Sequence, residues 1–305
     1  MDKLLDARAD KLLFYSPYNF IRDISIDKQL NLLVYPSLKD SKALTYEVTL
    51  NNQNHVFVYE HLSWDSDYFN LNTYKLKGVL FSDHNIDQLT EAIKQFRNEA
   101  LPIGSYVFLE IPSEDILLLQ ALGRAGFQLV ETRLTYFRGN LNDFNEPRYP
   151  VRKATISDID NLKLVACQMR NDYDRFHADP IFNQEIADNF LATYIEQSLK
   201  GFADIVLTSN EDQIPSDSFL TAKYLKSDWD ILGTKVSKMV LSAVSNKTNK
   251  GWYKKLISEM TYHLREQGAE YIFLNTQSTN RAVFYTWEKL GYKLGATTHI
   301  LSYSK

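Results

Sequence analysis

One segment of the sequence, residues 239–264, combines the residue types that can bind a phosphate group. A short apolar run ends at Leu241, a polar turn follows, and apolar residues recur at helical spacing after Gly251. A strand that turns directly into a helix leaves backbone N–H groups at the positive end of the helix dipole, where an anion can bind. Four lysines add positive charge around this turn: Lys247, Lys250, Lys254 and Lys255. The alternative is an ordinary strand–turn–helix connection with a solvated lysine cluster, because one glycine is a weak motif. We expect Thr248 or Asn249 to cap the helix and Gly268 to end it.

A second segment, residues 275–285, brings an amide and a phenol to the start of another helix. Asn280 can cap that helix, or its side chain can hydrogen-bond an amide of a bound ligand. Tyr285 carries a hydroxyl that can give a proton to a leaving group in a dry site. The alternative for Tyr285 is simple packing, since the chain has 19 tyrosines.

Candidates for a base and for contacts to an acceptor are weaker. His177 and His299 are the histidines we consider, and each has a structural alternative. Arg175, with Phe176 and His177 beside it, could bind a substrate diphosphate, and a surface salt bridge is the alternative. An amine can also lose its proton to ordered water, so no side-chain base is required.

Composition limits the classes of protein. With 305 residues the chain suits two domains or one large one, and its net charge of −4 does not suit a general nucleic-acid binder. The single cysteine, Cys167, excludes an internal disulfide framework and a cysteine-rich zinc site, and we expect no metal. No apolar run is long enough for a membrane span, and the first residues do not form a signal peptide, so we expect a cytoplasmic protein.

The sequence repeats itself at a fixed offset of 165 residues. Residues 271–275 (YIFLN) match residues 106–110 (YVFLE), and residues 290–292 match residues 125–127 as a glycine stop between apolar residues. The repeat argues for two related domains. At this offset Gly251 corresponds to Ile86 and Tyr285 to Gln120, so the first copy lacks both the turn and the phenol. We expect one working site.

Periodicity predicts a mixed α/β protein. In the first half we expect a leading helix and strand within residues 1–35, strands at 44–50 and 56–59, and a loop at 62–69. After these we expect a helix at 86–96, a strand at 106–111, a helix at 116–125 and a strand at 129–137. A boundary near the two prolines of residues 146–150 precedes a second half that reads strand, helix, helix, three strands, helix, strand, helix, strand.

The second half resembles the GCN5-related N-acetyltransferase (GNAT) family from Val151 to the C-terminus. The residues that carry the resemblance are the Gly251 turn, Asn280, Ala282, Phe284-Tyr285 and Leu290-Gly291-Tyr292. The turn departs from the family pattern, because Thr248 and Tyr253 stand where the family has Gln or Arg and then Gly or Ala. The resemblance implies two GNAT-like domains in tandem, a divergent one over residues 1–147 and a catalytic, acetyl-CoA-binding one over residues 148–305.

The same resemblance implies roles for individual residues. The end of the central strand would pair with the pantetheine arm, the turn would hold the pyrophosphate, and Asn280 would bind the arm. The expected acetyl-CoA ligands are therefore Leu241, Ser242, Ala243, Asn246, Lys247, Thr248, Asn249, Lys250, Gly251, Trp252, Tyr253 and Asn280. Tyr285 would be the general acid, and the acceptor would lie near Arg175, Phe176 and His177.

The whole chain is also similar to a narrower group, the bacterial dTDP-fucosamine acetyltransferases. The matching pieces are residues 64–69, 126–131, 175–176, 194–196 and 276–285. This similarity implies a nucleotide-linked amino sugar as acceptor. The alternatives are a peptide or another small amine as acceptor, and a non-catalytic binding module. We expect a small-molecule substrate and no nucleic-acid or membrane partner, and leave open a homodimer.

Overall fold

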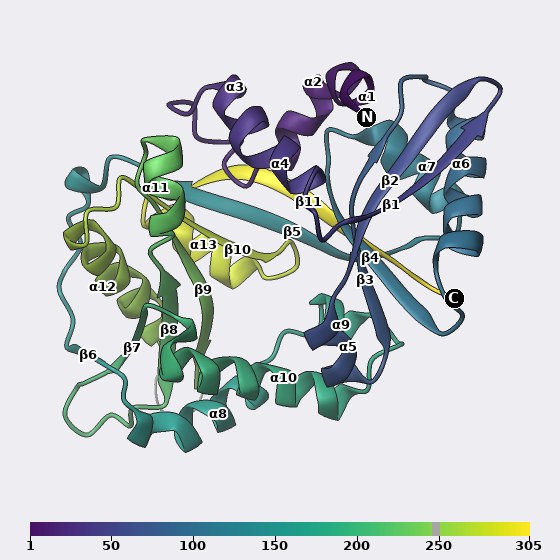
Figure 1. Cartoon of the computed structure of the whole chain (residues 1–305). Helices are drawn as coiled ribbons and strands as arrows, with labels where there is room; N and C mark the ends of the chain where they lie inside the picture. The colour runs from purple at the N-terminus through teal and green to yellow at the C-terminus, as the bar shows by residue number, and fades with distance from the viewer. Residues whose placement is uncertain (246–250) are drawn as a thin grey trace. The chain divides into compact units, whose positions relative to one another are not determined.

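The computed structural model describes residues 1–245 and 251–305, and the chain falls into two compact units (Figure 1). Unit 1 comprises Met1–Arg133 together with Ala296–Lys305, and unit 2 comprises Leu134–Gly295. The dividing points fall within strands β5 (Gln128–Arg138) and β11 (Lys293–Ser304), so the end of the chain belongs to unit 1. The boundary expected at residues 147–148 concerns the duplicated sequence rather than contacts, and it stays a prediction.

Unit 1 is built on a mixed sheet. Its strands are β1 (Leu44–Leu50), β2 (Gln53–His61), β3 (Asn72–Leu80) and β4 (Ser105–Pro112). β1, β2 and β3 run antiparallel in order, β3 is parallel to β4, and residues 298–304 of β11 pair antiparallel with β4. The helical segments are α1 (Asp2–Ala7), α2 (Ala9–Leu12), η1 (Leu13–Tyr15), α3 (Ile26–Gln29), η2 (Leu30–Val34), α4 (Tyr35–Leu38), α5 (Ser63–Phe69), α6 (Ile86–Gln95), η3 (Phe96–Ala100) and α7 (Ile116–Arg124).

Strand β2 divides its side chains between two cores, as the two-residue period of a strand requires. Val56 and Val58 pack with the N-terminal helices. Phe57 and Tyr59 pack with α6 and α7, and the Phe57 ring stacks on Phe96 with 4.6 Å between centroids. Both faces of this strand are therefore covered by helices of unit 1.

Unit 2 continues the same plan with a longer antiparallel part. Its strands are β6 (Val151–Lys153), β7 (Ile205–Ser209), β8 (Ser218–Lys223), β9 (Val236–Val244) and β10 (Tyr271–Gln277), next to the last part of β5. β6 to β9 are antiparallel neighbours, and β10 is parallel to β9. The helical segments are η4 (Leu141–Asp143), η5 (Ile156–Asp158), α8 (Ile159–Gln168), α9 (Arg175–Ala178), α10 (Gln184–Gln197), η6 (Ser198–Phe202), α11 (Lys226–Leu232), α12 (Trp252–Glu266) and α13 (Arg281–Lys289).

Two cores cover the two faces of the unit 2 sheet. Ile205 and Leu207 of β7 belong to a cluster with α12 and α13, which contribute Leu256 and Trp287 among others. Val206, between them, belongs to a second cluster with α8 and α10. The alternation of β7 thus places α12 and α13 on one face and α8 and α10 on the other.

The parallel strands separate at the same place in both units. β9 pairs with β10 only up to Lys238 opposite Phe273, although β9 continues to Val244 and β10 to Gln277. β3 likewise pairs with β4 only up to Lys75 opposite Phe108. Phe108 and Phe273 are 165 residues apart, so the sequence repeat is a repeat of structure. Each unit therefore holds a pair of strands that open toward their carboxyl ends.

Each of these first strands also bulges just beyond the last pair. On β9, two residues lie between Met239 and Ser242, whereas the facing residues of β8 are separated by one. On β3, Lys77 is the additional residue, opposite the bond between Val58 and Tyr59. A bulge bends its strand and increases the local twist. The bulge thus accounts for the separation of the parallel strands.

Several expectations for unit 1 are wrong. The strand expected within residues 1–35 is absent from this part of the described chain, because Leu30–Val34 forms a π-helix turn that continues into α4. The expected loop at residues 62–69 is helix α5, in which Phe69 is buried and Trp64 is exposed. Strand β3 was not predicted, because lysines and a glycine interrupt its apolar pattern. The order of elements predicted for unit 2 is confirmed, with α9 and α11 as additional short helices.

Candidate active site

Helix α12 begins in a conformation that suits a ligand. Its N-cap is Gly251, with φ +88°, and among the described residues no side chain caps the helix. A Cβ atom at Gly251 would have no described atom within 4 Å. No described side chain thus satisfies the N–H groups of the first turn, which are the groups of a helix that can bind a ligand or water. The expected capping side chains, Thr248 and Asn249, lie outside the described residues. The same holds for five predicted ligands: Asn246, Lys247, Thr248, Asn249 and Lys250.

Two of the lysines predicted to attract phosphate are already in ion pairs. Lys254 Nζ lies 2.9 Å from Glu146 Oε2, and Lys255 Nζ lies 2.8 Å from Glu211 Oε2. The Glu146 carboxylate raises the pKa of the Lys254 ammonium. The start of α12 therefore relies on backbone N–H groups more than the sequence suggested.

The side chains of Trp252 and Tyr253 serve the scaffold of the site. Trp252 is 2% exposed and belongs to the core between the sheet and α12. The Tyr253 hydroxyl accepts a hydrogen bond from Trp287 Nε1 at 2.8 Å and shares another with the Ser242 side chain. Burial raises the pKa of Tyr253, so this phenol keeps its proton. This contact joins β9, α12 and α13. Because the side chains of Trp252 and Tyr253 are engaged in it or in the core, these two residues can act as predicted ligands only through their backbone N–H groups.

The bulge on β9 changes what the strand can offer. The Leu241 N–H donates to Thr221 Oγ1 at 2.9 Å, and the Thr221 hydroxyl donates to the Leu241 carbonyl at 3.2 Å. The predicted pairing of Leu241 with a ligand arm does not fit, because the bulge turns its peptide groups toward β8. Ser242 and Ala243, which lie beyond the bulge, pair with Leu220 and Phe219 of β8.

Helix α13 presents the predicted amide and phenol. Asn280 occupies the N-cap position of α13, but its side chain makes no capping hydrogen bond within the described part of the chain. The capping alternative is therefore not observed. Tyr285 is 58% exposed, which contradicts the packing alternative, and the Lys289 ammonium lies 4.3 Å from its ring centroid. Trp287, two residues later, is the buried aromatic residue of this helix.

Sequence reasoning missed one buried amide in this region. Asn275 of β10 lies two residues beyond the last pair with β9, and its Nδ2 donates to Thr135 Oγ1 at 2.7 Å. Its Oδ1 is buried and has no hydrogen-bond partner among residues 1–245 and 251–305. Alternation along β10, with Ile272 and Leu274 in the core, places Asn275 on the face opposite α12. That alternation was readable in the sequence.

Short helix α9 holds the three residues expected to contact the acceptor. Arg175 is 9% exposed and lies over the Phe176 ring, 4.3 Å from its centroid. The Phe176 ring in turn contacts Phe182 and Phe190, with centroids 5.3 and 4.6 Å away. In this arrangement Phe176 packs α9 against α10, and Arg175 lies over the Phe176 ring.

His177 is engaged on both sides of its ring. Nδ1 lies 2.8 Å from Asp174 Oδ2 and Nε2 lies 3.1 Å from Asp188 Oδ1, with 1% of the side chain exposed. Burial opposes the charged imidazolium, but the bonds to the two carboxylates outweigh it and raise the pKa of His177. An enclosed imidazole with both ring nitrogens bonded to carboxylates cannot touch an acceptor, so the predicted role does not fit.

His299, the other candidate base, belongs to unit 1. Its Nε2 lies 3.0 Å from Ser113 Oγ and its Nδ1 lies 3.1 Å from Thr132 Oγ1. Burial lowers the pKa of His299. Both ring nitrogens of His299 are therefore engaged by hydroxyl groups of unit 1.

Within residues 1–245 and 251–305, no group of three or more histidine, cysteine or acidic side chains is placed to hold a metal ion. No helix in the same ranges is long and apolar enough to cross a membrane.

Neither a protein-family model nor a curated protein matches the sequence. Solved structures match at low identity. A tandem GNAT protein from the clavulanic acid biosynthesis pathway is 9% identical and aligns over 99% of this chain and 95% of its own, with a TM-score of 0.50. The GCN5-related N-acetyltransferase from Sphaerobacter thermophilus is 11% identical over 98% of this chain and 93% of its own, with a TM-score of 0.53. This chain has the tandem GNAT fold.

A third structure agrees with this assignment. A GNAT-family acetyltransferase from Colwellia psychrerythraea is 13% identical over 92% of this chain and 97% of its own, with a TM-score of 0.51. At such identities the likeness concerns the fold. The expectation of two GNAT-like domains in a mixed α/β chain is confirmed. Within unit 2, the Tyr253 hydroxyl links the first turn of α12 to Ser242 of β9 and to Trp287 of α13, whereas α9 is a packed helix.

Proposed function

We propose that unit 2 is an N-acyltransferase domain that transfers the acetyl group of acetyl-CoA to an amine. One arrangement carries the proposal: β9 and β10 separate after Lys238 and Phe273, and the uncapped start of α12 follows β9. Diverging strand edges can hydrogen-bond an extended ligand arm. Backbone N–H groups at a helix start can bind phosphate. An arm that ends in a diphosphate matches both features.

Each residue of the site then has a limited task. The backbone of Ser242 and Ala243 would hold the arm, and the N–H groups that follow Gly251 would hold the diphosphate. The Asn280 side chain, which makes no cap, would hydrogen-bond an amide of the arm. Bound acetyl-CoA would supply an acetyl thioester, whose transfer to an amine releases a thiolate.

Tyr285 would provide the proton for that thiolate. Its side chain is 58% exposed, so its hydroxyl can reach a bound ligand. A phenol that donates to a departing sulfur acts as a general acid, a role that typically contributes about 10²–10⁴-fold to rate. The amine would lose its proton to water, since both ring nitrogens of His177 are engaged by carboxylates.

For the acceptor, we propose the amine of a nucleotide-linked amino sugar of the dTDP-4-amino-4,6-dideoxyhexose type. The support is the resemblance of short segments of the sequence, residues 64–69 of unit 1 among them, to dTDP-fucosamine acetyltransferases. A peptide amine or another small amine is the alternative acceptor, and a binding module without activity is the alternative to catalysis.

Thiol release from acetyl-CoA tests these possibilities together. We expect the purified protein to bind acetyl-CoA and to release thiol faster with the dTDP-linked amino sugar than with free amino sugars or peptide amines. A preference for peptides would replace the acceptor and keep the chemistry. Binding without thiol release across the panel would indicate the non-catalytic module, and absence of binding would refute the proposal.

A further inference from the structure

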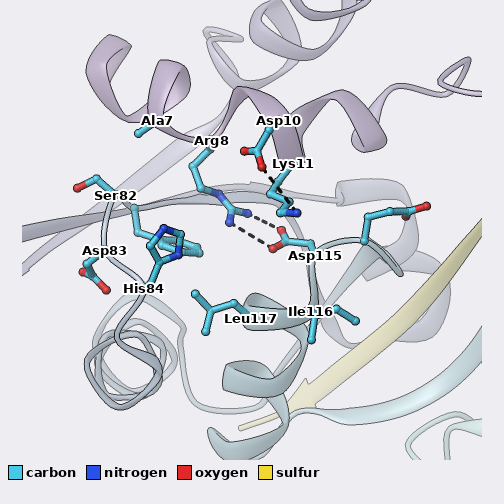
Figure 2. A pocket seen from close by; sticks show the side chains of 12 residues that line it. Ala7, Arg8, Asp10, Lys11, Ser82, Asp83, His84, Asp115, Ile116 and Leu117 are labelled. Atoms are coloured by element: carbon cyan, nitrogen blue, oxygen red, sulfur yellow. Dashed lines mark hydrogen bonds and ion pairs between the residues drawn. The ribbon is translucent and has the colours of Figure 1, made fainter.

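Unit 1 contains a pocket of about 180 Å³ at the place that corresponds to the start of α13 in unit 2 (Figure 2). Its walls come from residues 81–84, which follow β3, and from residues 114–117 at the start of α7. At the repeat offset of 165, Asp115 corresponds to Asn280. The pocket is therefore the unit 1 copy of the cleft in which we place the ligand arm of unit 2.

The N-terminal segment of the chain occupies the remaining side of this cleft, where Ala7, Arg8, Asp10 and Lys11 line it. Figure 2 shows the Arg8 guanidinium, between α1 and α2, directed at the Asp115 carboxylate. Arg8 Nη1 donates to Asp115 Oδ1 at 3.2 Å, and Nη2 donates to Oδ2. The Arg8 guanidinium carbon also lies 4.0 Å from the Phe81 ring centroid. Both partners are buried, with Arg8 5% and Asp115 1% exposed.

A second group secures the same carboxylate. The Tyr15 hydroxyl donates to Asp115 Oδ2 at 2.7 Å, and burial raises the pKa of Tyr15 well above its usual range. The tyrosine therefore stays a donor. The Asp115 carboxylate thus receives hydrogen bonds from two residues of the N-terminal segment, which is a bidentate, charge-assisted arrangement of the stronger kind.

The side of the cleft that residues 81–84 and 114–117 form suits a cation and not a phosphate. Besides Asp115, they contribute Asp83 and Glu114. The adjacent start of α6 is already capped, because Asn85 Oδ1 accepts from the N–H groups of Asp87 and Gln88 at 3.0 and 3.2 Å. The acidic side chain of Asp87 adds negative charge in the first turn.

We propose that α1 and α2 are an internal occupant of one side of the duplicated cleft of unit 1, with the Arg8 guanidinium as the group bound to Asp115. The segment takes the place that an external ligand takes in unit 2, and unit 1 is closed to acyl-CoA. One part of this inference rests on the proposed function, namely that the corresponding place in unit 2 binds a ligand. Removing Arg8 leaves the Asp115 carboxylate buried with less compensation, a change that destabilises a protein more than loss of an exposed pair.

Hydrogen exchange of the full chain, followed by mass spectrometry, tests this occupancy without any acyl-CoA. In Arg8→Ala we expect exchange at least about tenfold faster in α1, α2 and the first turn of α7, with α12 and α13 unchanged. Lys11→Ala is the matched control, because Lys11 lines the same pocket from α2 but is 41% exposed and pairs with the exposed Asp10. This control should exchange as the wild type does.

Two results would overturn the proposal: wild-type exchange in Arg8→Ala, or equal acceleration in Lys11→Ala. If Arg8→Ala does not fold, Arg8→Lys, which keeps the charge and loses the bidentate geometry, should still accelerate the same segments several-fold. Wild-type exchange in Arg8→Lys would then refute the proposal. Because the readout needs no ligand, failure of unit 2 to bind acetyl-CoA would refute the proposed function and leave this test intact.

Discussion

Helices α6 and α12 begin at equivalent points of the two units and differ in what their first turns can bind. Each follows a bulged strand that separates from its parallel neighbour at the same register. The first turn of α6 is capped by Asn85 and carries Asp87. The first turn of α12 begins at Gly251, with no cap from a described side chain and no acidic residue. The duplication preserved the backbone geometry, and a few side chains decide whether it can hold an anion.

The second helices of the two units differ in the same sense. Asp115 at the start of α7 binds Arg8 and Tyr15, whereas Asn280 at the start of α13 makes no side-chain cap. Five residues further on, unit 1 has Gln120 and unit 2 has Tyr285. The comparison therefore predicts that substitutions in unit 2 change catalysis and that the matched substitutions in unit 1 change only stability.

The largest effect is expected at Tyr285. Tyr285→Phe keeps the ring and removes the proton, so kcat should fall by about 10²–10⁴-fold, or roughly 3–5 kcal/mol of barrier. Affinity for acetyl-CoA should change much less, because the arm and diphosphate are held elsewhere. The measurement is steady-state thiol release. Gln120→Leu, the matched change in unit 1, should leave kcat unchanged, and a Phe variant within about threefold of wild type would remove Tyr285 from the chemistry.

The next effect concerns the turn. Gly251 has φ +88°, which a β-branched residue adopts only with strain, and its Cβ would enter the space beside the helix start. Gly251→Val should therefore raise the apparent KM for acetyl-CoA at least several-fold. Ile86→Val, at the equivalent position of unit 1, should leave this KM unaltered. Wild-type KM in a folded Gly251→Val protein would show that the diphosphate binds elsewhere.

A third comparison uses the two asparagines at helix starts. Asn85 accepts two backbone N–H bonds and Asn280 caps nothing. Asn85→Ala should lower the free energy of unfolding by about 0.5–2 kcal/mol and leave the KM for acetyl-CoA alone. Asn280→Ala should do the reverse, with a higher KM and little loss of stability. Urea unfolding and thiol-release kinetics of both variants decide it, and equal destabilisation by the two would restore capping as the role of Asn280.

Local patterns predicted the elements that hold the site, because those patterns are strong there. Leu256, Ile257, Met260 and Leu264 recur at helical spacing, and α12 forms over Trp252–Glu266. The apolar residues 271–274 form most of β10. The repeat at offset 165 also predicted which residues correspond in the two units, and the shared register of Phe108 and Phe273 confirms it.

Features that depend on contacts distant in sequence could not be read in this way. The pairing of β11 with β4 joins residues 298–304 to residues 106–112. The ion pair of Lys254 with Glu146 and the bond of Tyr253 to Trp287 likewise span long separations. Bulges are decided by strand pairing, so the occupied peptide of Leu241 was not predictable.

The smallest effect compares two histidines whose pKa values shift in opposite directions. The bonds to Asp174 and Asp188 raise the pKa of His177 in unit 2, and burial lowers that of His299 in unit 1. A histidine whose pKa is raised in the folded protein stabilises the fold at pH values below its pKa in the unfolded chain, which is near 6.5. This contribution is lost as the pH rises through the pKa of the folded protein.

A lowered pKa acts in the opposite sense, because the unfolded chain then binds the proton more readily. The stability that depends on neutral His299 is present above about pH 6.5 and falls as the pH drops through the lowered folded pKa. His177→Gln should therefore destabilise the protein more at pH 5.5 than at pH 8, and His299→Gln should destabilise it more at pH 8 than at pH 5.5. Urea unfolding of both variants and the wild type at these two pH values measures the difference. If both substitutions destabilise the protein more at the same one of the two pH values, at least one histidine is not held in the protonation state that its neighbours favour.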